Sequence, residues 1–319
     1  NDCEFGIDVS GNGASITNCT VDVIEDGVGI ELSGNEGVIE KNKVSNTCDY
    51  LIEVSGDNNL VRQNTLTNSD ESGIDLSGDN NVIERNRITG CCDDLINASG
   101  LNLVVSSNRV ALCDGTGIVV SGNNPTISKN TVCATGDDDY GIECDSEEGG
   151  VVENNRVSDS IDHGYYITMS DGTVKANRAD NCGAEDEAGF YIQGDMNLIE
   201  NNTAKDCESN GFELNGSSNT MFKNKAQNCT VNGILITSEP APKGEGGGVS
   251  QSNILDGNVA TGNQGQGLLN EGPGTVIRKN RLTNNRQDLT NATSAGANYV
   301  DDGGNKFNTG GLEVEPDIT

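Results

Sequence analysis

The sequence contains no tryptophan, a single histidine and only 3% aromatic residues, and it has no long apolar run. Apolar residues make up 33% of the 319 residues, whereas glycine alone contributes 42. One thick globular core would need more large apolar side chains than this. The composition therefore favours a thin core built in regular layers. Because no stretch approaches roughly eighteen consecutive apolar residues, a transmembrane helix is excluded.

Basic residues are also scarce: 19 Lys and Arg stand against 50 Asp and Glu, for a formal net charge of −31. This charge repels phosphates and so argues against nucleic acid and anionic membranes as general partners. Calcium and basic protein surfaces fit it better. The chain begins at Asn1 without a Met or an apolar leader, which we interpret as processing of an exported protein or a cut from a longer one.

The eleven cysteines lack the paired C-x-x-C spacing of a zinc site. Disulfide bonds in an oxidising extracellular or cell-surface setting account for them better, and the odd number leaves at least one cysteine outside an internal pair. The Asn-x-Ser/Thr sequons agree with that location. They give these candidate glycosylation sites: Asn18, Asn97, Asn201, Asn215, Asn228 and Asn291.

A repeated phrase organises the chain. The segment SGIDLSGDNNVIERNRITG at 72–90 nearly repeats VGIELSGNEGVIEKNKVSN at 28–46, and most repeats are 22 residues long. Each repeat holds three short runs of β type, separated by Gly, Asn, Asp and Ser, and no helical period appears. This pattern predicts an all-β fold, a single parallel β-solenoid of about 13 coils over 1–319 with an inserted loop at 238–250.

One asparagine recurs at the same place in every repeat. An inward asparagine must pair its amide, and stacking on its neighbours in adjacent coils achieves this. We therefore expect an internal asparagine ladder, structural rather than ligand-binding, that comprises Asn42, Asn64, Asn86, Asn108, Asn130, Asn155, Asn177, Asn202, Asn224, Asn258, Asn280 and Asn305.

The repeated pattern GIxLSGxxNxIxxNxI resembles the right-handed parallel β-helix proteins of the pectate-lyase-like superfamily, which include NosD-like and disaggregatase-like surface proteins. The resemblance covers almost the whole chain. It implies the fold and leaves the function open, because the superfamily contains polysaccharide lyases, hydrolases, epimerases, adhesins and structural rods.

Equivalent positions of the repeats should stack into columns. The position after the ladder asparagine is rich in bases and forms a candidate interaction stripe with Arg87, Arg109, Arg156 and Arg178. The third position of the GIxL phrase is acidic, as in Asp8, Glu31, Glu53 and Asp75. Columns of opposite sign suit self-association or binding to other surface proteins, and the acidic column suits calcium or mere solvation. Glu40, Arg62 and Glu84 alternate in sign, which predicts ion pairs between coils.

Cysteines also recur in register, five residues after the ladder asparagine. Neighbouring coils are close enough for disulfides between them. The candidate pairs are Cys91–Cys113 and either Cys182–Cys207 or Cys207–Cys229.

The only histidine, His163, lies in DSIDHGYYITM beside Asp162, Tyr165 and Tyr166, with Phe190 and Tyr191 one coil later. Two interpretations remain open. In the first, a sugar-binding or epimerase-like site uses His163 or Tyr166 as base, with Asp162 beside them. In the second, Tyr165, Tyr166 and Phe190 fill a widened coil and His163 sits on its turn. The Asp-Pro-His segment of mannuronan epimerases is absent.

A run of carboxylates at Asp137, Asp138 and Asp139 is the candidate calcium site, with a solvated acidic turn as the alternative. Calcium is the one cofactor that the sequence suggests. Neither end shows an amphipathic capping helix, so we expect the ends to dock on other subunits or on further domains of a longer chain. The sequence thus favours an extracellular structural or adhesive rod, a subunit of a filament, sheath or surface layer. The alternatives are a lyase, epimerase or hydrolase acting on acidic polysaccharide, and a carbohydrate-binding module.

Overall fold

The computed structural model describes residues 5–24, 27–136, 139–184, 187–237, 252–291, 299–308 and 313–314. The described part contains β-strands and turns and no helix, so none of its elements could cross a membrane as a helix. Contacts divide the chain into two compact units, residues 1–161 (unit 1) and 162–319 (unit 2). The inserted loop predicted at 238–250 lies outside the described residues.

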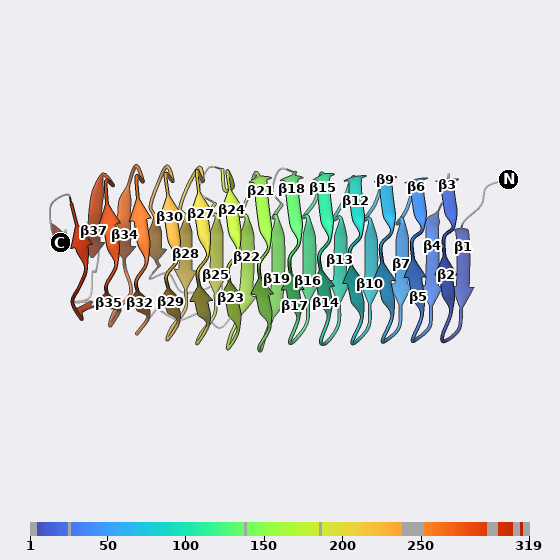
Figure 1. Cartoon of the computed structure of the whole chain (residues 1–319), viewed down its shortest axis with the longest axis horizontal. Coiled ribbons are helices and arrows are strands. Elements are labelled where there is room, and N and C mark those ends of the chain that lie inside the picture. Colours follow the sequence, from blue (N-terminus) through green and yellow to red (C-terminus); the bar gives the residue numbers. More distant parts are fainter. Residues whose placement is uncertain are drawn as a thin grey trace, which may run out of the picture. The chain divides into compact units, whose positions relative to one another are not determined.

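Unit 1 is a parallel β-solenoid in which every coil gives one strand to each of three sheets (Figure 1, blue to green). Sheet A contains β1 (Phe5–Ser10), β4 (Val28–Ser33), β7 (Ile52–Ser55), β10 (Ile74–Ser77), β13 (Ile96–Ser99), β16 (Ile118–Ser121) and β19 (Ile142–Ser146). Sheet B contains β2 (Ser15–Thr17), β5 (Val38–Glu40), β8 (Leu60–Arg62), β11 (Val82–Glu84), β14 (Val104–Ser106), β17 (Thr126–Ser128) and β20 (Val151–Glu153). Sheet C contains β3 (Thr20–Ile24), β6 (Lys43–Thr47), β9 (Thr65–Ser69), β12 (Arg87–Cys91), β15 (Arg109–Cys113), β18 (Thr131–Thr135) and β21 (Arg156–Ser160).

Unit 2 repeats the same three-sheet plan (Figure 1, green to red). Its sheet A strands are β22 (Tyr165–Met169), β25 (Phe190–Gln193), β28 (Phe212–Asn215), β31 (Ile234–Ile236), β34 (Gln266–Asn270), β37 (Gln287–Asn291) and β40 (Glu313–Val314). Sheet B contains β23 (Thr173–Lys175), β26 (Leu198–Glu200), β29 (Thr220–Phe222), β32 (Ile254–Asp256), β35 (Val276–Arg278) and β38 (Val300–Asp301). Sheet C contains β24 (Arg178–Asp180), β27 (Thr203–Lys205), β30 (Lys225–Gln227), β33 (Val259–Thr261), β36 (Arg281–Thr283) and β39 (Lys306–Phe307). The strands of sheets A, B and C number 14, 13 and 13, which confirms the predicted fold of about thirteen coils.

Each coil is stabilised by side chains that stack on the equivalent side chains of the neighbouring coils. In the coil that contains 72–90, the inward side chains are Ile74 of β10, Ile83 of β11 and Ile88 of β12, all fully buried. The parallel register places Ile74 between Ile52 and Ile96 of the neighbouring coils. Because each buried side chain rests on an equivalent one, small aliphatic residues fill the thin core without any need for tryptophan.

The internal asparagine ladder is confirmed in both units. In unit 1, Asn86 Oδ1 accepts from the main-chain N–H and the Nδ2 of Asn64, each at 3.0 Å, while Asn86 Nδ2 donates to Asn108 Oδ1 at 3.1 Å. In unit 2 the same pattern runs from Asn177 Nδ2 to Asn202 Oδ1, also at 3.1 Å. Each amide therefore satisfies the polar groups of a buried turn.

A second asparagine ladder runs along the turns between sheets A and B. It was not predicted from the sequence. In unit 1, Asn59 accepts from Gly37 N at 2.7 Å, and Asn81 accepts from Asn59 N at 2.7 Å. In unit 2, Asn219 accepts from Asn197 N at 2.8 Å. The signal was present in the recurrent Asn five residues before the main ladder position.

Glycine is required where successive coils approach most closely. Gly78 has φ +124°, and a Cβ there would lie 2.3 Å from the carbonyl oxygen of Gly56 in the preceding coil.

We expect Gly78→Ala to lower the free energy of unfolding by about 1–3 kcal/mol, through backbone strain and overpacking. Urea unfolding followed by circular dichroism measures the change. Gly13→Ala is the matched control, because Gly13 also has positive φ (+69°) but no atom within 4 Å of the added Cβ. Equal losses in both variants would contradict the steric part of this explanation.

The columns on the outer surface also follow the prediction. Asp8, Glu31 and Glu53 are aligned along sheet A of unit 1, and Arg87 lies beside Arg109 in sheet C. Glu40 pairs with Arg62 at 2.9 Å, which confirms the expected ion pair between coils, whereas Glu84 pairs with Arg85 at 2.7 Å. The acidic column therefore lies on sheet A and the pair of arginines on sheet C, while sheet B carries residues of both signs.

Candidate active site on sheet A of unit 2

Two neighbouring strands of sheet A in unit 2 carry two stacks of aromatic rings. The register aligns Tyr165 with Phe190 and Tyr166 with Tyr191, in β22 and β25. Because side chains alternate along a strand, one pair points inward and the other outward. Tyr165 and Phe190 are fully buried, with ring centroids 4.4 Å apart, and Phe190 stacks in turn on Phe212 at 4.8 Å. These inward rings fill the coil, as one interpretation predicted.

The outward pair differs from that interpretation. Tyr166 and Tyr191 are half-buried on the outer face of sheet A, with ring centroids 5.1 Å apart and planes inclined by 6°. The expectation that Tyr166 fills the core is therefore wrong, because its place in the strand alternation turns it outward. Each ring covers one face of the other, so a ligand can contact the ring edges and the hydroxyl groups. The Tyr191 hydroxyl donates to Gln193 Oε1 at 3.1 Å.

His163 lies beside this pair, on the turn that leads into β22. Its ring centroid is 5.6 Å from that of Tyr166 and 5.0 Å from that of Tyr191, and only 6% of the residue is exposed. The main-chain N–H of Ala188 donates to His163 Nδ1 at 2.8 Å, closer than the Ala188 carbonyl oxygen at 3.3 Å. Nδ1 therefore carries the lone pair, and the ring proton is on Nε2.

Glu187 completes the arrangement from the next coil. Its Oε2 accepts from His163 Nε2, and this contact holds the pKa of the Glu187 carboxyl below its ordinary value. The carboxyl is 38% exposed and so reaches the outer surface. With both ring nitrogens engaged, His163 is a positioning residue in this geometry, and Tyr166 is the stronger candidate for proton transfer. Sequence reasoning found His163 and Tyr166 but missed Glu187, although it lies 24 residues, about one coil, after His163.

The remaining candidate site residues are Asp162, which precedes His163 in the chain, and the three aspartates at 137–139. Asp162 accepts a hydrogen bond from Gly183 N at 2.9 Å through its main-chain oxygen. Asp137 and Asp138 lie outside the described residues, and Asp139 in unit 1 accepts from Thr116 Oγ1 at 3.5 Å. Within the described ranges, no three His, Cys, Asp or Glu side chains are arranged to hold a metal ion.

Unit 1 carries a cluster of carboxylates on the same sheet and the turns before it. Burial, followed by repulsion from Asp93, raises the pKa of Asp94 to about 7. Burial also raises the pKa of Glu53, Asp75 and Glu143, with help from neighbouring acids. These groups are crowded with like charge and bind protons more readily in the folded state.

This crowding predicts a pH-dependent stability. The folded-state pKa of Asp94, about 7, exceeds its unfolded value of roughly 3.9, so the folded state binds the extra proton. The resulting stabilisation is complete below pH of about 4 and is lost as the pH rises through about 7. We expect the urea midpoint to fall between pH 5 and pH 8 and expect Asp94→Asn to flatten that dependence. Asp114→Asn, at an exposed carboxylate of the next coil, is the control. An unchanged slope in Asp94→Asn would refute the assignment.

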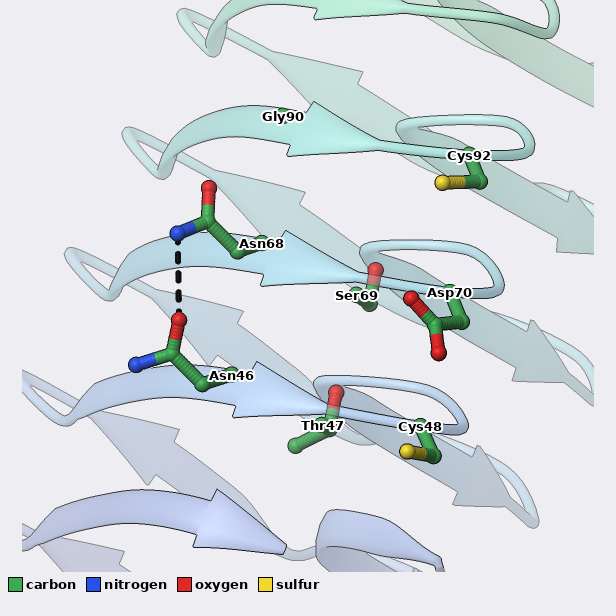
Figure 2. Close-up of a pocket in the computed structure, with 8 residues that line it drawn as sticks. All are labelled: Asn46, Thr47, Cys48, Asn68, Ser69, Asp70, Gly90 and Cys92. Carbon is green, nitrogen blue, oxygen red and sulfur yellow. Dashed lines mark hydrogen bonds between the residues drawn. The ribbon is translucent and has the colours of Figure 1, made fainter. Parts of the chain in front are cut away.

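A shallow hollow of about 350 Å³ lies on unit 1 at the end of sheet C, lined by Asn46, Thr47, Cys48, Asn68, Ser69, Asp70, Gly90 and Cys92. Figure 2 shows Cys48 and Cys92 on the coils either side of Asp70, and the hydrogen bond from Asn68 Nδ2 to Asn46 Oδ1 at 3.1 Å. The hollow holds no aromatic ring and only one carboxylate. It therefore lacks the groups that make the tyrosine and histidine cluster a candidate active site.

The cysteine register is as predicted, and the disulfides themselves remain predictions. Cys91 is aligned with Cys113, and both are buried thiols whose pKa burial raises, to about 11 and about 12. Cys207 and Cys229 are buried thiols in hydrogen-bonding contact. Of the sequons, Asn18, Asn201 and Asn228 are exposed, whereas Asn215 is buried and cannot carry a glycan in this fold.

Comparison with known proteins agrees with this architecture. A family model described as a right handed beta helix region matches residues 5–137 and 140–309. A search of the curated proteins finds no match. Among solved structures, a double mutant of the periplasmic alginate epimerase AlgG is similar with a TM-score of 0.65 and 14% identity, covering 88% of this chain and 76% of that chain.

Two further solved structures are similar. A mannuronic acid specific polysaccharide family 6 lyase from human gut microbiota has a TM-score of 0.54 and 14% identity, covering 98% of this chain and 86% of that one. The catalytic unit of a GH87 α-1,3-glucanase from Streptomyces thermodiastaticus has a TM-score of 0.51 and 13% identity, covering 94% and 63%. At these identities the likeness shows the shared fold alone.

These neighbours overturn the main functional expectation from the sequence. The chain was expected to be a structural or adhesive rod, a subunit of a filament, sheath or surface layer. The similar solved proteins are instead an epimerase, a lyase and a glucanase. The expectation of a filament subunit is therefore wrong: exposed coil ends and charged columns are compatible with a solenoid that carries a site on one sheet.

Proposed function

We propose that this chain, which belongs to the right-handed beta helix family, is an exported enzyme that acts on polysaccharide through sheet A of unit 2. One observation carries the proposal. Tyr166 and Tyr191 stack on the outer face beside a buried His163, whose ring is held by the Ala188 N–H and the Glu187 carboxylate. A buried histidine with both nitrogens engaged is held in one orientation. Its partner Glu187 has a lowered pKa, and groups with shifted pKa values gather at functional sites.

The residues have distinct roles in this proposal. Tyr166 supplies a phenolic hydroxyl as acid or base, and Tyr191 lies against it with its own hydroxyl directed to Gln193. His163 and Glu187 fix the position of the tyrosine edges, because both tyrosine rings contact the imidazole. The long face of a parallel sheet suits a linear polymer, since equivalent positions recur about every 4.8 Å along it.

The similar solved structures support the polysaccharide class. An alginate epimerase, a mannuronic acid lyase and an α-1,3-glucanase share the fold while differing in reaction. The described location of one of them is periplasmic, which supports an exported location here. Cysteine content and sequons in the sequence agree with export.

An activity screen tests the proposal. The protein is incubated with neutral glucans, chitosan and polyuronates, and reducing ends and product size are measured. We expect release from at least one polymer, and a loss of about 10²–10⁴-fold in Tyr166→Phe. Tyr299→Phe is the matched control, since Tyr299 is a half-buried tyrosine elsewhere in unit 2. An absence of turnover on every polymer, or full activity in Tyr166→Phe, would reject the proposed function.

A further inference from the structure

We infer that the polysaccharide bound on sheet A of unit 2 carries no carboxylates, so that the reaction is hydrolysis of a neutral or amino-sugar polymer. This inference rests on the proposed function and deepens it. It departs from the expectation, drawn from the sequence, that the substrate is an acidic glycan.

The argument begins with where the bases lie. The strands of sheet A in unit 2 contain no Lys or Arg among their described residues, and neither do the described turns that lead from sheet A to sheet B. The outward column that starts at Tyr166 continues through Tyr191, Glu213, Leu235 and Leu269. This column offers an acid and aliphatic groups and no positive charge. A polyuronate laid along it would meet no counterion from these side chains.

Carboxylates flank the tyrosines instead. Glu213 is half-buried in register with Tyr191, and the Nδ2 of Asn210 donates to its Oε2 at 3.3 Å. Glu187 reaches the same surface, and its lowered pKa keeps it ionised at neutral pH. A uronate carboxylate beside these two would be repelled, whereas sugar hydroxyl or ammonium groups can donate to them.

The Lys and Arg residues of the coils that contain Tyr166 and Tyr191 lie on sheets B and C, and each pairs with an acid. Arg178 is bonded to Asp180 at 2.5 Å, Lys205 to Asp206 at 2.6 Å, and Lys175 to Glu200 at 3.5 Å. Among the described turns of unit 2 that lead into sheet A, the one Lys or Arg is Arg286, before β37. In the sheet order, β37 is four strands from β25. At about 4.8 Å a strand this is roughly 19 Å, beyond the screening length of about 8 Å.

The lack of Lys and Arg on the described part of this face bears on the chemistry. Elimination and C5 epimerisation both remove the proton next to a uronate carboxylate, and the negative charge that develops there is stabilised by a positive group or by hydrogen-bond donors aimed at it. Hydrolysis develops no such anion. It breaks the bond between the anomeric carbon and the bridging oxygen, transfers a hydroxyl from water to that carbon, and returns a proton to the bridging oxygen. A carboxylate that works with a second acid or base serves such a reaction, and on this face Glu213 is the candidate carboxylate, with Tyr166 as the second group.

Polymers of different charge test the inference. Polymannuronate and polygalacturonate, each with EDTA and with Ca²⁺, are compared with a soluble α-glucan and with chitosan. We expect new reducing ends from the glucan or the chitosan, which separates neutral from amino-sugar substrates, without the ultraviolet absorbance of an unsaturated uronate. Turnover of a polyuronate that is lost in Tyr166→Phe would overturn the inference and leave the proposed function standing. Turnover of nothing would instead reject the proposed function.

Affinity electrophoresis through gels that contain polymannuronate gives a second readout, independent of turnover. The wild type should migrate without retardation, and Glu213→Arg should be retarded, because it places a base in the outward column. Glu213→Gln serves as the neutral control, and circular dichroism confirms that each variant is folded. Retardation of the wild type that Glu213→Arg does not increase would count against the inference.

Discussion

Replacing Asn86 with alanine is expected to lower the free energy of unfolding by about 3–5 kcal/mol, which is a large loss for the replacement of one buried polar residue. Asn86 Oδ1 accepts two hydrogen bonds from Asn64, and its Nδ2 donates to Val61 O at 2.9 Å and to Asn108 Oδ1. Alanine leaves these buried groups without partners, each at a cost of about 1–3 kcal/mol. The midpoint of urea unfolding, followed by circular dichroism, measures the loss.

The control for this experiment is Asn97→Ala. Asn97 also belongs to unit 1, but it is half-buried on the outer face of sheet A, where its Nδ2 donates to Asp75 at 3.1 Å. Water can replace that bond, so the expected loss is below about 1 kcal/mol. Asn86→Asp should cost at least as much as Asn86→Ala, since a second oxygen would face Val61 O and Asn108 Oδ1. Similar losses in Asn86→Ala and Asn97→Ala would refute the structural importance of the ladder.

The second large effect concerns the carboxylate behind His163. In Glu187→Gln we expect turnover of the substrate found in the polymer screen to fall by about 10²–10⁴-fold, since changing the carboxylate that orients a histidine to an amide can cost about 10⁴-fold in kcat. A neutral amide accepts more weakly from His163 Nε2, and its flipped form places a donor there, so the ring loses its single orientation. The loss should appear in kcat with little change in KM, because Glu187 acts through His163 and Tyr166.

The pH dependence distinguishes this role from a purely structural one. The contact with His163 lowers the folded-state pKa of Glu187, so its stabilising contribution is present above the ordinary pKa of about 4.3 and is lost as the pH falls through the lowered value. The decrease in kcat at acidic pH that follows protonation of Glu187 should therefore be absent in Glu187→Gln. Glu208→Gln, at an exposed carboxylate of the next turn, is the control. Unchanged kcat in Glu187→Gln, in a folded protein, would exclude Glu187 from the site.

The repeat made most of the fold predictable. Alternating runs such as Ile74 and Leu76, followed by an asparagine every 22 residues, specify which side chains face inward, because a strand has a period of two. The ladder, the aligned charge columns and the cysteine register all follow from that periodicity. The second ladder through Asn59 and Asn81 could have been read from the same alignment.

The candidate site was only partly predictable. His163, Tyr166 and Tyr191 stand out as rare residues in a chain with few aromatics, so composition alone drew attention to them. Which tyrosine points outward depends on the phase of β22, and the insertions in this part of the chain obscure that phase in the sequence. The filament interpretation failed for a related reason: unpaired coil ends and charged stripes are properties of any solenoid, so they do not separate a rod from an enzyme.

By itself, the sequence determined the coil, its core and its ladder, since a local period of two within a repeat of 22 leaves one way to bury the apolar residues. Only the tertiary structure decided that Glu187 meets His163 and that the imidazole has no free nitrogen. It also decided that the described residues of the outward face beside the tyrosines include no Lys or Arg. Those facts depend on the register between coils with inserted residues, and register is set by packing across the solenoid rather than by neighbours along the chain.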